Sequence, residues 1–127
     1  MALRWATDNP MANQRLLRVE SLLREEIGSL ILRDAIKDPR VDRMLSISRV
    51  ADSKDLAHAK VAVSGFKGRD ELRDAVNGLN SASGFIQQQL GRKLHFKSTP
   101  RLTFVEDHSI EEGFAVNRSL DDLSSGT

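Results

Sequence analysis

Two helical patterns in the middle of the chain share one apolar face, although residues that favour turns separate them. Apolar side chains recur at α-helical spacing at Leu72, Val76, Leu79, Ala82, Ile86, Leu90 and Leu94. Between the two halves, residues 80–84 read Asn-Ser-Ala-Ser-Gly, a composition typical of caps and turns. The pattern predicts two helices, over 69–80 and 82–91, that bend at this junction and pack on the same surface. We expect Phe85 to face inward with Ile86 and Leu90.

The other patterns predict an α+β fold. A long amphipathic helix is expected over 13–37, ended by Asp38-Pro39, because a residue before proline is disfavoured in the α region. Residues 44–50 and 58–64 alternate as two strands, which a polar turn joins into an antiparallel hairpin. A third strand follows Pro100, and a capping box from Ser109 to Glu112 opens a short helix that runs to Leu123. This order predicts a three-stranded sheet with helices packed on one face.

The length of 127 residues fits a single domain, which we expect over 13–123, with flexible tails at 1–12 and 124–127. The only tryptophan, Trp5, lies in the first tail. The chain has no cysteine, which excludes disulfides, thiol catalysis and cysteine-bound zinc. Because no apolar run is long enough for a membrane span or a secretory signal, we expect a cytoplasmic protein.

Charge is unevenly distributed although the net charge is only +1. Residues 75–105 contain no Asp or Glu but carry Arg92, Lys93, Lys97 and Arg101, whereas residues 106–127 are mostly acidic. A basic strip in a nearly neutral protein indicates a phosphate-binding surface, although four cations alone also fit an ordinary solvated face. Aromatic residues are too few for a base-stacking platform, so we expect contacts to phosphate, sugar and shape.

Patterns for catalysis or metal binding are weak. Asp107-His108-Ser109 contains the residue types of a catalytic triad, but three consecutive residues rarely converge on one point. The segment from Gly65 to Gly68 is a literal G-x-x-G, but it follows a strand and precedes a helix, whereas the clamp of KH domains joins two helices. We therefore predict a binding protein that is not an enzyme and uses no cofactor or metal.

Several motifs in one order resemble the bacterial ribosome-binding factor A family. They include Lys37-Asp38-Pro39-Arg40, the run from Asp55 to Val61, Ser83-Gly84-Phe85-Ile86, Pro100-Arg101-Leu102-Thr103-Phe104 and the run from Asp107 to Glu111. The similarity spans about residues 18–123 and implies a type II KH-like domain. In this family an Ala-x-Gly kink replaces the G-x-x-G loop, and here it is Ala82-Ser83-Gly84. We expect glycine to let the backbone turn sharply, so that Gly84→Ala destabilises the fold.

The resemblance also implies a function. Family members bind the small (30S) ribosomal subunit and its 16S ribosomal RNA, near the 5′ end and the decoding region, and support precursor processing, especially in the cold. The candidate RNA-binding residues are therefore Ala82, Ser83, Gly84, Gln87, Gln88, Arg92, Lys93, Lys97 and Arg101. Second candidates surround the end of the first helix: Arg33, Lys37, Arg40 and Arg43. We expect a monomer with no membrane partner. An α/β protein-interaction module without RNA binding is the alternative.

Overall fold

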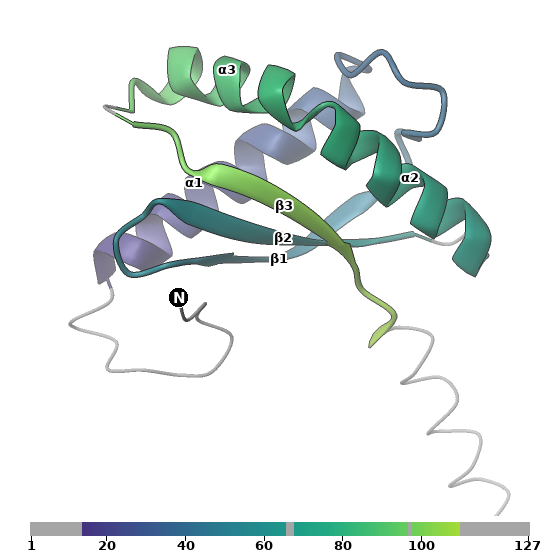
Figure 1. The fold of residues 1–127 in the computed structure, drawn as a ribbon, viewed down its shortest axis with the longest axis horizontal. Helices are drawn as coiled ribbons and strands as arrows, with labels where there is room; N and C mark the ends of the chain where they lie inside the picture. Colours follow the sequence, from purple (N-terminus) through teal and green to yellow (C-terminus); the bar gives the residue numbers. More distant parts are fainter. Residues whose placement is uncertain (1–13, 66–67, 97, 110–127) are drawn as a thin grey trace, which may run out of the picture.

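In the part of the chain that the structure describes, three helices and three strands follow one another in the predicted order (Figure 1). The computed structural model describes residues 14–65, 68–96 and 98–109. The elements are α1 (Gln14–Leu32), β1 (Ser46–Asp52), β2 (His58–Ser64), α2 (Arg69–Ser81), α3 (Ser83–Leu94) and β3 (Arg101–Glu106). The predicted α+β class is confirmed. The final helix predicted after Ser109, the tails with Trp5, and Lys97 lie outside the described residues.

The described strands form one mixed sheet in the order β1-β2-β3. β1 and β2 pair antiparallel, which confirms the predicted hairpin, with a register irregularity between Ile47 and Arg49. β3 pairs parallel to β2, with Val61 opposite Phe104. A parallel return needs a long crossover, and α2 and α3 provide it.

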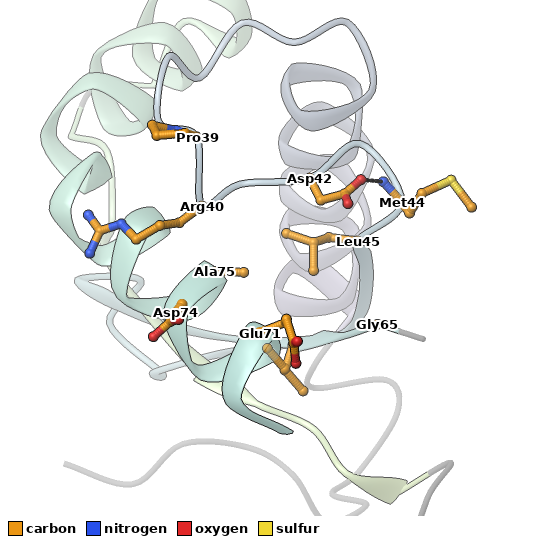
Figure 2. A pocket seen from close by; sticks show the side chains of 10 residues that line it. Pro39, Arg40, Asp42, Met44, Leu45, Gly65, Glu71, Asp74 and Ala75 are labelled. Atoms are coloured by element: carbon orange, nitrogen blue, oxygen red, sulfur yellow. Dashed lines mark hydrogen bonds between the residues drawn. The ribbon is translucent and has the colours of Figure 1, made fainter. Parts of the chain in front are cut away.

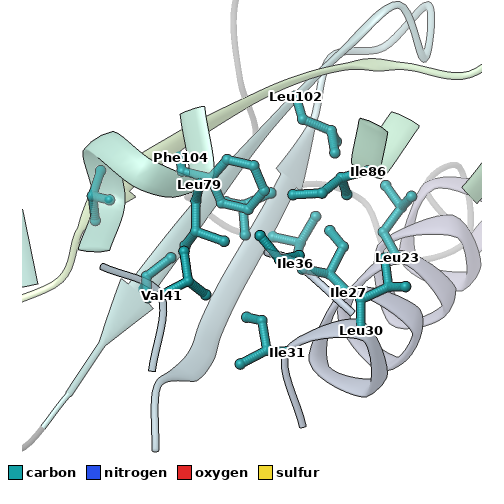
Figure 3. Packing of buried hydrophobic residues seen from close by; sticks show 14 of the residues in the cluster. Leu23, Ile27, Leu30, Ile31, Ile36, Val41, Leu79, Ile86, Leu102 and Phe104 are labelled. Atoms are coloured by element: carbon teal, nitrogen blue, oxygen red, sulfur yellow. The ribbon is translucent and has the colours of Figure 1, made fainter. Parts of the chain in front are cut away.

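The core lies between the helices and one face of the sheet (Figure 3). Alternation in the strands directs Ala59, Val61 and Val63 of β2 inward, where they meet Leu102 and Phe104 of β3. The apolar stripes of the helices supply the other side, with these fully or almost fully buried residues: Leu23, Ile27, Leu30, Ile31, Leu79, Ile86 and Leu90. The shared apolar face predicted for the two middle helices is therefore confirmed.

Helix α1 ends at Leu32, five residues before the predicted end at Lys37. Asp34 adopts a left-handed conformation with φ of 57°. Its N–H donates to the carbonyl of Ile31 at 3.1 Å, and the N–H of Ala35 donates to the carbonyl of Leu30 at 3.0 Å. This is a Schellman cap with aspartate in the position that glycine usually takes. The prediction relied on Pro39 as the stop, but the chain leaves the helix earlier, so Lys37 lies in a connecting segment.

Two other boundaries differ from the prediction. β1 runs over 46–52 rather than 44–50. α3 continues through Gly91 and ends at Leu94. The next residue, His95, caps the helix in a left-handed conformation with φ of 54°. Gly91 stands inside the helix where the following loop comes close, because a Cβ there would lie 2.8 Å from Oγ1 of Thr99. The predicted helix stops at this glycine, but in the structure the glycine allows close packing instead.

Side-chain amides from both helices of the crossover bind β3, one of the two edge strands of the described sheet. Asn80 in α2 accepts from the N–H of Phe104 at 2.8 Å and donates to its carbonyl at 3.0 Å. Gln87 in α3 accepts from the N–H of Leu102 at 3.1 Å. These bonds satisfy polar groups that an edge strand otherwise leaves exposed, and they fix both helices to the sheet.

Candidate nucleic-acid interface

A single residue, Ala82, separates α2 from α3. Figure 1 shows the two helices following each other with a bend between them. Ala82 has φ of −93° and ψ of 7°, outside the helical range. Its N–H is shared between the carbonyls of Gly78 and Leu79, both at 3.1 Å, and its own carbonyl accepts from the N–H of Ile86 at 3.0 Å. Hydrogen bonding therefore continues across the bend. The predicted junction is confirmed, and the conformation that breaks the helix belongs to the alanine.

The expectation that Gly84 makes the turn is wrong. Gly84 is the second residue of α3, and no described glycine has a positive φ. A Cβ at Gly84 would meet no atom of the described chain within 4 Å, and the residue is exposed. Because neither a special backbone angle nor internal packing requires glycine, Gly84→Ala should not destabilise the fold. The missing side chain leaves the start of α3 open to a partner.

Beyond the bend, α3 presents an exposed polar face. Gln88, Arg92 and Lys93 are exposed, and the two cations lie in the last turn, where positive charge is favourable. Ser83 is half-buried at the start of the helix. Gln87 is also half-buried, and its Oε1 is already bonded to the backbone of β3. Gln87 thus serves the fold as well as any contact with RNA.

A surface hollow brings Arg33, one of the second group of candidates, close to Arg92 and Lys93 of the first group. The hollow has a volume of about 210 Å³ and lies between α1 and α3. Its lining consists of Glu26, Leu30, Arg33, Gln89, Leu90, Arg92 and Lys93. Arg33, which follows α1, therefore shares a site with Arg92 and Lys93, far away in the sequence. Three cations surround this hollow against one carboxylate, so it favours an anion.

A second hollow, of about 240 Å³, lies at the bend itself. The segment after α1 forms one wall, with Ile36 and Lys37, and the bend forms the other, with Ala82 and Phe85. Phe85 is 42% exposed, so the prediction that it faces inward is wrong. Ile86 takes the buried position, and Phe85, the next position round the helix, points outward. Two neighbouring apolar residues do not by themselves show which one is buried, so the sequence did not reveal this exposed aromatic group.

The remaining candidates lie outside these two hollows. Arg40 donates to both carboxylate oxygens of Asp38, at 3.0 and 2.8 Å. This bidentate bond lowers the pKa of Asp38 to about 2 and raises the pKa of Arg40. Arg43 lines a different hollow together with Arg24. Arg101 is exposed at the start of β3, opposite His58 of β2.

The triad-like residues make separate contacts at the end of β3. His108 contacts Glu106 at 3.0 Å. The Asp107 carboxylate accepts from the Ser48 hydroxyl at 2.6 Å and from the Ser109 N–H at 2.8 Å. The Ser48 bond is the main reason why the pKa of Asp107 is lowered. These bonds join β1 to the chain after β3. Among the described residues, no cluster of three or more His, Asp or Glu side chains could hold a metal ion, and no helix is long and apolar enough to cross a bilayer.

Comparison with known proteins identifies the family. The family model for ribosome-binding factor A matches residues 15–120. The chain belongs to the ribosome-binding factor A family. It is 48% identical to ribosome-binding factor A of Treponema denticola over 113 residues, which cover 89% of this chain and 86% of that protein.

Solved structures agree with this family assignment. The crystal structure of ribosome-binding factor A from Thermus thermophilus superposes with a TM-score of 0.61 at 27% identity, covering 71% of this chain and 92% of that one. A homology model of Thermus thermophilus ribosome-binding factor A has been fitted into the cryo-EM map of its complex with 30S. It superposes with a TM-score of 0.58 at 26% identity, covering 72% of this chain and 93% of that one. The fold of this ribosome-binding factor A homologue is therefore that of its family.

Proposed function

We propose that this protein binds the small ribosomal subunit during its assembly, through ribosomal RNA held on α3 and the adjoining hollows. The observation that carries the proposal is the clustering of Arg33, Arg92 and Lys93 around one hollow between α1 and α3. The family supports it, because a relative of similar fold has been fitted into the map of a 30S complex. The cations neutralise phosphates, and that contribution to binding does not depend on base sequence.

Each part of this surface has a chemical task. At Gly84 the bare backbone leaves room for a phosphate or sugar to approach the start of α3. Gln88 reaches sugar or base edges, and Lys97 and Arg101 extend the basic strip. Phe85 offers one exposed ring, on which an unpaired base can stack. The domain acts as a KH-like unit over 13–123, with the Ala82 bend in place of the G-x-x-G loop.

The biological role follows the family resemblance. We propose an assembly factor without catalytic activity that acts in the cytoplasm as a monomer. It contacts 16S ribosomal RNA near its 5′ end and the decoding region, and it supports precursor processing and growth in the cold. These finer assignments stay predictions, and crosslinking the protein to subunit precursors in cells, followed by mapping of the RNA, tests where it binds.

Salt dependence separates this proposal from a protein-interaction module. If about four phosphates are neutralised, log affinity plotted against log salt concentration falls with a slope of roughly −3, using the coefficient for single strands. The measurement is a fluorescence titration of single-stranded precursor RNA at several salt concentrations. A flat response contradicts the electrostatic interface and favours the alternative module.

Charge reversal locates the surface. Arg92→Glu with Lys93→Glu should greatly weaken co-sedimentation with small subunits while the fold persists, because exposed substitutions usually change stability by about 0.5 kcal/mol or less. Arg15→Glu with Arg18→Glu, on the exposed first half of α1, is the matched control and should matter less. Equal effects of the two pairs would show that net charge, and not this surface, governs binding.

A further inference from the structure

A third hollow lies away from the basic surface, between the segment 39–45 and the first half of α2 (Figure 2). Its volume is about 200 Å³. Leu72 and Ala75 of α2 are buried, and Leu45 is partly buried. Together these three side chains form an apolar floor. Met44 stands at the rim and is 67% exposed. Among the described residues, Met44 is one of four large hydrophobic side chains that remain substantially exposed.

The rim of this hollow is acidic. Three carboxylates line it, from Asp42, Glu71 and Asp74, against the single guanidinium of Arg40. Figure 2 shows these groups around the opening. Arg40 binds both oxygens of Asp38 and also attracts the Asp74 carboxylate, so it offsets part of the rim charge and leaves an acidic excess. Arg73 contacts Asp74 only at 3.8 Å on an exposed surface, a kind of ion pair that contributes little.

Local structure accounts for some of these residues but not for the whole arrangement. Asp42 accepts from the N–H of Met44 at 2.8 Å and shapes the turn before β1. Glu71 lies in the first turn of α2, where negative charge is favourable. Neither role explains why the large apolar side chain of Met44 is exposed beside these carboxylates. Methionine is flexible and polarisable, and it is frequent on surfaces that adapt to peptide partners.

We propose that this acid-rimmed hollow is a docking site for a basic protein segment in which one apolar side chain is flanked by lysines or arginines. The apolar side chain would occupy the floor formed by Leu45, Leu72 and Ala75. The flexible Met44 side chain, which points away from the opening in Figure 2, would turn to cover it. The flanking cations would meet the three carboxylates. RNA does not fit, because its phosphates would be repelled by the same groups. The site goes beyond the RNA surface proposed above and uses different residues, so either can fail without the other.

The test is a titration of the free full-length protein with short synthetic peptides, followed by NMR of the Met44 methyl group and the amides of Leu45 and Ala75. A peptide with one leucine between lysines should produce saturable shifts at these groups at about millimolar concentration or below. Replacing the leucine by serine, or the lysines by glutamates, should abolish them. A single-stranded oligouridine should leave these signals unchanged.

Two variants with matched controls complete the test. Asp74→Lys and, separately, Met44→Ser should each weaken peptide binding by about fivefold. Glu25→Lys makes the same change of net charge on the exposed face of α1, and Leu17→Ser removes another exposed apolar group. Both should bind the peptide normally. Four results would each overturn the proposal. The peptide produces no saturable shifts, or the serine or glutamate peptide binds equally well. Alternatively, the shifts are confined to α3, or the control variants lose as much binding.

Discussion

Two glycines on either side of the bend have opposite surroundings. Gly78 in α2 is buried, and a Cβ there would lie 3.2 Å from Cγ of Asp38 and 3.2 Å from Cγ2 of Val41. Gly84 in α3 is exposed, and a Cβ there would meet no described atom within 4 Å. Gly78 therefore allows the segment after α1 to pack closely on α2. Gly84 has no such task inside the fold.

This difference separates stability from binding along one pair of helices. Where glycine is packed, adding a side chain displaces the protein's own atoms, so the cost appears in the free energy of unfolding. Where glycine is open, the added side chain has room in the free protein, so any cost appears only when a partner arrives. Because Gly84 has no internal reason in the fold, we propose that its reason is a contact outside the molecule.

The largest effect is expected at the packed glycine. Gly78→Val should lower the free energy of unfolding by about 1–3 kcal/mol, the usual range for an overpacked site, because the new side chain meets Asp38, Arg40 and Val41. Gly84→Val is the matched control and should change stability little. Chemical denaturation of both variants measures the difference. Similar losses in both would mean that valine lowers helix stability at either site and that packing at Gly78 is unimportant.

The amide contacts to β3 should come next. Asn80→Ala removes two bonds to Phe104 and should cost about 1–2 kcal/mol, whereas Gln87→Ala removes one bond to Leu102 and should cost about 0.5–1 kcal/mol. The exposed neighbours Asn77 and Gln88 provide alanine controls on the same helices. Denaturant titrations give the four values. If Gln87→Ala leaves stability unchanged but lowers RNA affinity, its role lies at the interface alone.

The sequence predicted the described helices and strands, their order, the hairpin and the bend, because these depend on local periodicity and turn composition. It did not predict the end of α1, because the left-handed cap residue is an aspartate. Without the usual glycine, the sequence at the cap cannot be told from a continuing helix. The roles of Gly78 and Gly91 depend on which segment packs against each glycine, and only the fold supplies that. For the same reason, the sequence grouped Arg33 with Arg40 and Arg43, whereas the structure places Arg33 beside Arg92 and Lys93.

A smaller effect of opposite sign is expected at the open glycine. Gly84→Ala should raise the free energy of unfolding by about 0.5–1 kcal/mol, because alanine is the better helix former. Co-sedimentation with small subunits should weaken by about tenfold if the methyl group keeps RNA away from the backbone. Thermal melts and sedimentation of one preparation provide both values. Higher stability with unchanged binding would make Gly84 an ordinary helical glycine.

The smallest effect concerns the segment that Gly78 contacts. Asp38 has a pKa of about 2, lowered from 3.8 chiefly by the side-chain bond from Arg40. A lowered carboxyl pKa stabilises the fold above the unfolded value, and that contribution disappears as the pH falls from about 4 towards 2.

Arg40→Gln should move the pKa of Asp38 part of the way towards its usual value and reduce this acid dependence, because the backbone N–H of residue 40 still donates to Asp38. The pKa of Asp55, which the Ser53 hydroxyl lowers, should not move and serves as the internal control. Carboxyl NMR titrations of both proteins measure the two pKa values. Because the bond is exposed, Arg40→Gln should change stability at neutral pH far less than Gly78→Val. If instead it destabilises the protein as strongly, the conformation that the ion pair gives this segment matters as much for its packing on α2 as the close approach at Gly78.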